Sequence, residues 1–175
     1  MSEVQVKGKV TALIDGQFGS TGKGLIAAYL ATVETWPFAT TNASANAGHT
    51  AILEDGTKHV TFHLPMASVI DPDCEAYLNA GAIIDPELFI KELKDNHVNP
   101  KKVKIHPRAA IITKLHKAAE MNTGSAQTRS ASTRKGVGAA LAAKVTRDAL
   151  LAADIAELQP FISTIDVTAR LDRGA

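Results

Sequence analysis

The apolar residues of this chain fall in short blocks separated by polar and glycine-rich stretches, and the lengths of these blocks predict an α/β fold. Residues 10–14 form a short apolar run that predicts a buried strand, and residues 25–30 predict a helix soon after it. Residues 76–78 and 82–84 are further apolar runs, and residues 103–105, V-K-I, predict a short strand. Strands that alternate with helices favour a largely parallel sheet flanked by helices.

Turn and capping residues predict the remaining elements. Asp55 and Gly56 lie between the β-like runs 51–53 and 59–62, which predicts a hairpin. Asp85 followed by proline is a typical helix start, with the aspartate as N-cap and the proline at the first helical position. The same pattern predicts a strand at residues 38–41, helices at residues 111–121 and 139–153, and a β-branched run at residues 161–167.

A glycine-rich segment joins the first predicted strand to the first predicted helix, with four glycines and Lys23 inside residues 16–24. Strand, glycine loop and helix in this order form phosphate sites. Glycines let backbone N–H groups converge on an anion, and the helix N-terminus adds partial positive charge. A tight turn that binds nothing would need fewer glycines and no lysine. The glycines are Gly16, Gly19, Gly22 and Gly24.

The loop matches neither of two common nucleotide-binding fingerprints. Five residues separate Gly16 from Gly22, where the Walker A motif has four, and Gly24 stands where that motif has a hydroxyl. A Rossmann interpretation can use Gly22, Gly24 and Ala27, but it also requires an acidic residue about twenty positions later. Residues 42–46 contain no acidic residue, so this reading, and with it an oxidoreductase, is disfavoured.

Composition narrows the class of protein further. The chain has 175 residues, about one domain, with 45% hydrophobic residues and a net charge of +1, which indicates neither a nucleic-acid nor a membrane partner. Cys74 is the single cysteine, so no internal disulfide is expected and a reducing cytoplasm is the natural setting. His59 and His63 have no third candidate ligand nearby, which argues against zinc.

Two polar segments are further candidates for chemistry. In residues 46–50, N-A-G-H-T, the flexible Gly48 precedes His49, and histidine is the side chain best suited to proton transfer near neutral pH. Residues 123–138 contain hydroxyl groups, basic side chains and glycines but hardly any large apolar residue. Residues 130–138 within it suit a phosphate monoester, although composition alone favours a protease-sensitive loop.

Residues 18–24, F-G-S-T-G-K-G, resemble the nucleotide loop of the adenylosuccinate synthetase family, whose usual form is W-G-D-E-G-K-G. They are closer still to the phage branch of that family, in which Q-F-G-S-T-G-K-G is characteristic. N-A-G-H-T matches a second family motif. Residues 132–136 are similar to a third, S/T-T-G-R/Q-G, although Arg134 replaces a glycine. Residues 144–147 match K-V-x-R, so the resemblance covers most of residues 10–150.

The resemblance implies a purine nucleotide ligase with a P-loop-like architecture and Mg²⁺ as cofactor. In this family the purine O6 attacks the γ-phosphate of a nucleoside triphosphate, and L-aspartate then displaces phosphate from C6. The catalytic residues would be Ser20, Lys23 and His49, and Ser20 and Gly48 would hold the metal. The triphosphate site would comprise Gln17, Phe18, Gly19, Ser20, Thr21, Gly22, Lys23, Gly24, Gly48, His49 and Thr50. The substrate monophosphate would be held by Asn46, Ser132, Thr133 and Arg147, the last reaching across a homodimer.

Ser20 bears on the choice of substrate. The family's loop aspartate takes the purine N1 proton, and a neutral hydroxyl is a poor base at pH 7. Serine leaves room for an exocyclic 2-amino group, which points to dGMP, the substrate of the phage branch, and to a product for diaminopurine DNA. The near alternative is an ordinary adenylosuccinate synthetase that acts on IMP. The triphosphate donor could be ATP, dATP or GTP. The group that removes the N1 proton is not assigned.

Members of the family are considerably longer than this chain. We therefore expect residues 1–175 to form a single α/β nucleotide-binding region without the C-terminal part of the family. A fragment or one half of a split protein would bind nucleotide without turnover, which keeps a non-catalytic nucleotide-binding module as a competing hypothesis. If the chain is phage-encoded, its compartment would be the host cytoplasm.

Overall fold

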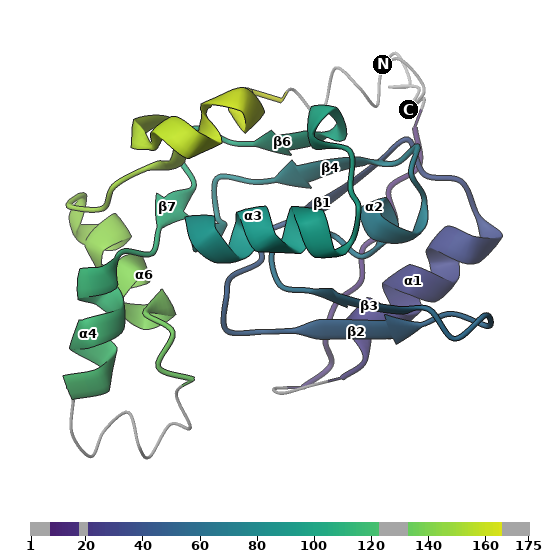
Figure 1. The fold of residues 1–175 in the computed structure, drawn as a ribbon, viewed down its shortest axis with the longest axis horizontal. Helices are drawn as coiled ribbons and strands as arrows, with labels where there is room; N and C mark the ends of the chain where they lie inside the picture. Colours follow the sequence, from purple (N-terminus) through teal and green to yellow (C-terminus); the bar gives the residue numbers. More distant parts are fainter. Residues whose placement is uncertain (1–7, 18–20, 123–132, 166–175) are drawn as a thin grey trace, which may run out of the picture.

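The computed structural model describes residues 8–17, 21–122 and 133–165, and it confirms an α/β fold built on parallel strands (Figure 1). The central sheet has the strand order β1-β4-β6. Thr41 pairs with Leu78, and Leu78 in turn pairs with Ile105 on its other side, both in parallel register. The strands are β1 (Phe38–Thr41), β4 (Glu75–Leu78) and β6 (Val103–Ile105).

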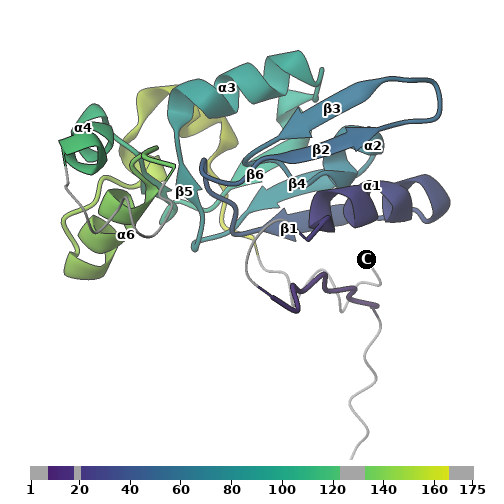
Figure 2. The same cartoon turned by 90° about the horizontal axis from the view of Figure 1, so that it is seen from below.

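Two smaller pairs of strands flank this sheet. β5 (Ile83–Ile84) pairs in parallel with β7 (Ala110–Ile111), and β2 (His49–Ile52) pairs antiparallel with β3 (Lys58–Thr61). The second pair confirms the predicted hairpin around Asp55 and Gly56, although β2 begins earlier than expected, at His49. The hairpin lies between α3 (Pro86–Asp95) and α1 (Lys23–Val33), as Figure 2 shows.

The other helices gather at the two ends of the molecule. α2 (Ala67–Ile70) packs against α1, while α4 (Lys114–Asn122) and α6 (Val137–Thr146) pack against each other beyond β7 (Figure 1). Short 3₁₀ turns complete the described part, at Pro100–Lys102, Ala152–Asp154 and Ala156–Phe161. Within the described ranges, none of the helices combines the length and the apolar character needed to cross a bilayer.

The apolar core lies between the central sheet and α3. Leu78, Ile105 and Phe89 are fully buried, and the Phe89 ring meets the Phe161 ring edge to face, with 5.2 Å between centroids. The Asp85 carboxylate accepts a hydrogen bond from the Leu88 N–H at 3.4 Å, which confirms the predicted N-cap of α3.

A buried carboxylate ties the hairpin to α3. Glu92 accepts hydrogen bonds from the backbone N–H groups of Phe62 at 2.9 Å, His63 at 3.0 Å and Leu64 at 2.8 Å. It also contacts Nδ1 of His63 at 3.1 Å, and Nε2 of His63 accepts from the Asp85 N–H at 3.2 Å. Nδ1 of His63 therefore carries the hydrogen, and its ring links three segments of the chain. His59 contacts Asn96 instead, so the two histidines have separate structural partners.

Three element predictions are wrong in the structure. Residues 10–14 form no strand, because they pair with no described strand, and Val10 and Ile14 are exposed. The helix predicted from residue 111 begins at Lys114, because residues 110–111 pair with β5. The helix predicted to end at residue 153 ends at Thr146, because Arg147 adopts a left-handed conformation with φ of 68°. Of the β-branched run at 161–167, Ile162 forms a single bridge with Ile105, and residues 166–167 lie outside the described residues.

We expect Glu92→Gln to lower the free energy of unfolding by roughly 2–4 kcal/mol, because an amide cannot accept from all these donors and brings N–H groups of its own. Urea denaturation measures the change. Glu87→Gln is the matched control, since Glu87 is exposed on the same helix. Equal, small effects of the two substitutions would contradict the assigned role of Glu92.

Cys74 provides a second test of the fold. It is 1% exposed, and burial raises the pKa of its thiol to about 12. At pH 8 only about one thiol in ten thousand is then ionised, so iodoacetamide should label the folded chain slowly. Mass spectrometry should show rapid labelling once urea unfolds the chain. Rapid, complete labelling without urea would mean that Cys74 is accessible.

Candidate functional site

The N-terminus of α1 is formed by the glycine loop. Gly22 has φ of 82° and is the N-cap, so a residue that tolerates the left-handed conformation is required there. Lys23 is the first residue of the helix. In the described part of the chain, no side chain caps the first N–H groups of α1, which leaves them available to an anion.

Asp15 holds Lys23 and Thr21 together. Its carboxylate accepts hydrogen bonds from the Lys23 ammonium and the Thr21 hydroxyl. The bond from Lys23, followed by that from Thr21, keeps the pKa of Asp15 below its ordinary value. Asp15 is not among the site residues predicted from the sequence. The signal that could have identified it is an acidic residue at the end of the apolar run, directly before the glycines.

His49 lies against α1 because Gly24 has no side chain. A Cβ on Gly24 would lie 2.4 Å from the Cβ of His49, so any larger residue would separate α1 from β2. Burial, and after it the positive charge of Lys23, lowers the pKa of His49. The imidazole is therefore neutral at pH 7, with one nitrogen available as a hydrogen-bond donor.

Gly48 and Lys135 meet at one aromatic ring. A Cβ on Gly48 would lie 3.1 Å from Cε1 of Phe62, so the backbone packs directly against the ring. The Lys135 ammonium lies 4.5 Å from the centroid of the same ring. Segments that are far apart in the sequence, and that both carry predicted site residues, are thus brought together by Phe62.

The N-terminus of α6 is occupied by a side chain of the protein. Glu120 accepts hydrogen bonds from the backbone N–H groups of Gly136 at 2.7 Å, Gly138 at 2.6 Å and Ala139 at 3.2 Å. Gly136 is the N-cap, with φ of 83°. A phosphate near this segment would therefore be bound by side chains such as Thr133, which is exposed, and not by these N–H groups.

The other end of α6 carries the two basic residues of the K-V-x-R motif. The Lys144 ammonium donates to the carbonyl oxygen of Ala80, and burial, followed by the charge of Arg108, lowers the pKa of Lys144. Arg147 is the C-cap of α6 and is exposed. Lys144 is thus tied to the fold, whereas Arg147 is accessible at the surface.

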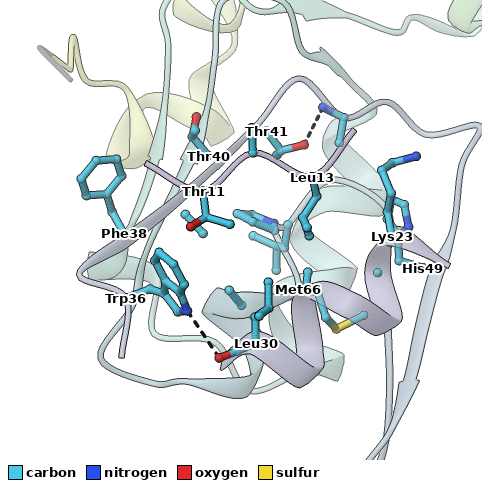
Figure 3. A pocket seen from close by; sticks show the side chains of 18 of the residues that line it. Thr11, Leu13, Lys23, Leu30, Trp36, Phe38, Thr40, Thr41, His49 and Met66 are labelled. Atoms are coloured by element: carbon cyan, nitrogen blue, oxygen red, sulfur yellow. Dashed lines mark hydrogen bonds between the residues drawn. The ribbon is translucent and has the colours of Figure 1, made fainter. Parts of the chain in front are cut away.

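A cavity of about 440 Å³ adjoins the start of α1 (Figure 3). Lys23 and His49 lie next to each other at one end of it, and Trp36 and Phe38 lie at the other. Gly24 also contributes to its lining, with Met66 and the segment at residues 9–13. One end of the cavity therefore carries Lys23 and His49, and the other carries aromatic rings, with the Lys9 ammonium 5.8 Å from the centroid of the Trp36 ring.

The structure brings part of the predicted site together. Lys23, Gly24 and His49 line one cavity, and Gly48 adjoins His49. Other predicted residues are described but do not line it: Gln17, Thr21, Gly22, Asn46, Thr50, Thr133 and Arg147. The Asn46 side chain accepts a hydrogen bond from the Ser44 hydroxyl at 2.5 Å. Phe18, Gly19, Ser20 and Ser132 lie outside the described residues.

We expect Gly24→Ala to destabilise the chain by about 1–3 kcal/mol, because the new methyl group meets the Cβ of His49 and either α1 or β2 must move. Thermal denaturation measures the loss. Gly16→Ala is the control, since no atom of the described residues lies within 4 Å of a Cβ at that position. An unchanged melting temperature for Gly24→Ala would show that α1 and β2 are not in close contact.

Comparison with known proteins identifies relatives over nearly the whole chain. A family model described as adenylosuccinate synthetase matches residues 12–173. The chain is 38% identical over 138 residues to N6-succino-2-amino-2'-deoxyadenylate synthase of Cyanophage S-2L, which covers 77% of this chain and 36% of that protein. It is 36% identical over 169 residues to adenylosuccinate synthetase of Pyrococcus sp. (strain ST700), covering 93% and 49%.

Comparison with solved structures finds the same kinds of relatives. The succinoaminodeoxyadenylate synthetase (PurZ) of Cyanophage S-2L, bound to dGMP and to dATP as an energy donor, superimposes with a TM-score of 0.74 at 34% identity. The match covers 91% of this chain and 46% of that structure. Adenylosuccinate synthetase from Plasmodium falciparum, at 20% identity and a TM-score of 0.69, shares the fold. The chain spans about a third to a half of the length of the curated relatives that it matches.

Proposed function

This chain belongs to the adenylosuccinate synthetase family, and we propose that it acts as a ligase that joins L-aspartate to C6 of dGMP. The family consists of enzymes that form a C–N bond. The observation that carries the proposal is the cluster of Lys23, Gly24 and His49 at the uncapped N-terminus of α1, an arrangement suited to a polyphosphate. The product would be N6-succino-2-amino-2'-deoxyadenylate, a precursor of diaminopurine DNA.

The residues at this site would have distinct roles. Lys23 would leave Asp15 for the triphosphate and neutralise charge on the transferred phosphoryl group. His49, neutral at pH 7, would donate a hydrogen bond to the purine O6 and stabilise negative charge there. Thr21, Gly22 and the start of α1 would contact the phosphates, as would Gln17, Phe18, Gly19 and Thr50 in the same proposal.

A magnesium ion fits this site if phosphates supply most of its ligands. Mg²⁺ prefers oxygen ligands and is commonly held by one or two protein groups together with substrate phosphates. The exposed Gly48 carbonyl and the Ser20 hydroxyl would be those groups, and the ion would neutralise charge on the phosphates. In the described residues no cluster of three or more histidine, cysteine or acidic side chains could bind a metal without substrate.

Ser20 supports dGMP over IMP. Its hydroxyl is smaller than a carboxylate and would leave room for the 2-amino group of guanine. The PurZ structure is bound to dGMP and dATP, which supports the same substrate here and an adenine nucleotide as donor. The monophosphate would contact Asn46, Ser132 and Thr133, with Arg147 contributed across a homodimer.

A non-catalytic nucleotide-binding module is the second candidate. The chain spans 36% of the cyanophage relative and 49% of the Pyrococcus relative. In that case the same groups would bind nucleotides, and aspartate transfer would require residues supplied by another polypeptide segment.

Phosphate release with Mg²⁺, L-aspartate and either ATP or dATP tests the proposal. We expect turnover with dGMP and at least tenfold less with IMP, and we expect Lys23→Met to abolish it because the phosphoryl charge is no longer neutralised. Faster turnover with IMP than with dGMP would indicate an ordinary adenylosuccinate synthetase activity instead. Tight binding of both nucleotides without phosphate release would contradict ligase activity and identify the chain as a non-catalytic nucleotide-binding module.

A further inference from the structure

We infer that Phe62 is a positioning residue that couples the two nucleotide-binding segments of the proposed site, with Lys135 as its partner. The segments are residues 46–50, which contain Gly48 and His49, and residues 133–138, which contain Thr133. This inference rests on the proposed function, because both segments are assigned to nucleotide binding there. Phe62 itself belongs to none of the motifs that identified the site.

The Phe62 ring contacts a residue of each segment. Gly48 packs so closely against the ring that a Cβ would lie 3.1 Å from Cε1. The Lys135 ammonium lies 4.5 Å from the ring centroid, within the range of a cation–π interaction, and its side chain is half-buried. One ring thus contacts the backbone next to the proposed catalytic histidine and a cation two residues after the proposed monophosphate residue Thr133.

The ring is held in place from the hairpin side. The backbone N–H of Phe62 donates to Glu92 at 2.9 Å, and the following two residues donate to the same buried carboxylate. The side chain of Glu92 is 1% exposed, so these bonds are shielded from water. The buried network therefore fixes the backbone from which the ring projects, so the ring can move only by rotation about its own side-chain bonds.

The lysine is held in place from the other side. Gly136, directly after Lys135, donates its N–H to Glu120 at 2.7 Å. A Cβ on Gly136 would lie 2.9 Å from the backbone nitrogen of Lys117, so α4 and this turn are in close contact. The α4–α6 pair is also joined to the rest of the fold by the Lys117–Asp85 ion pair and by an apolar cluster that contains Ala45 and Ala140. The Phe62–Lys135 contact adds to these a link that lies directly between the two nucleotide-binding segments.

Core packing alone does not account for Phe62. The residue is half-buried and belongs to neither of the two buried apolar clusters, unlike Phe89 and Phe161. A side chain that contributed only to stability would be expected to contact apolar neighbours in those clusters. Its contacts with a glycine and a lysine are those of a link between segments.

The first test uses the unliganded full chain. We expect Lys135→Met to shift the amide resonance of Gly48 in a ¹H–¹⁵N spectrum, because the cation leaves the ring on which Gly48 packs. Lys58→Met is the matched control, since Lys58 is an exposed lysine on β3. A Gly48 resonance that stays unchanged in Lys135→Met overturns the coupling, whether or not the chain binds nucleotides.

The second test measures the affinity for dGMP in the presence of Mg²⁺ and ATP by calorimetry. We expect Phe62→Leu and Lys135→Met each to weaken dGMP binding about three- to tenfold. The double variant should bind dGMP no more weakly than the single variant with the lower affinity, because both substitutions remove the same interaction. Phe62→Tyr and Lys135→Arg keep the cation–π pair and should restore near-native affinity. Additive losses, or a Phe62→Tyr variant as weak as Phe62→Leu, overturn the inference.

Nucleotide binding that is absent from the unsubstituted chain would refute the proposed function, and the amide shift would still decide the coupling. Thermal denaturation of each variant accompanies both tests. A loss of dGMP affinity that tracks a loss of melting temperature across the variants would assign Phe62 a structural role and overturn the inference.

Discussion

The buried carboxylate of Glu92 is the constraint on which much of this structure depends. A carboxylate removed from water is costly unless it is fully hydrogen-bonded, and Glu92 meets that requirement only when three successive backbone N–H groups and His63 converge on it. This convergence fixes where β3 ends relative to α3. It also aligns His63 with the Asp85 N–H, so the N-cap of α3 is set by the same network.

The parts of the fold that the sequence predicts correctly are those encoded locally. The Asp-Gly turn and the Asp-Pro helix start each determine nearby geometry, and both are confirmed. Residues 10–14 show the limit, because an apolar run becomes a strand only if a distant segment supplies hydrogen bonds. The end of α6 shows another, since Arg147 adopts a left-handed conformation without the glycine that normally signals a helix end.

The residues of the candidate site also fall into two groups, those that the sequence identifies and those that only the structure identifies. Lys23, Gly24 and His49 were found because glycine spacing and residue type point directly to phosphate and proton chemistry, and the cavity contains all three. Asp15, Phe62 and Glu120 were missed because their significance lies in what they contact. An acid, an aromatic ring and a second acid are ordinary residues in a sequence, and only the fold places them beside Lys23, Gly48 and Gly136.

α1 and α6 both begin with a left-handed glycine, yet they treat negative charge in opposite ways. No side chain of the described residues caps the first amides of α1, whereas the N-cap of α6 donates its N–H to a carboxylate sixteen positions earlier in the chain. An external anion at α6 would have to displace a tethered competitor whose effective concentration is high. Two helix starts that both combine a left-handed glycine with a neighbouring lysine therefore differ in their access to anions, and Glu120, a residue outside either motif, determines the difference.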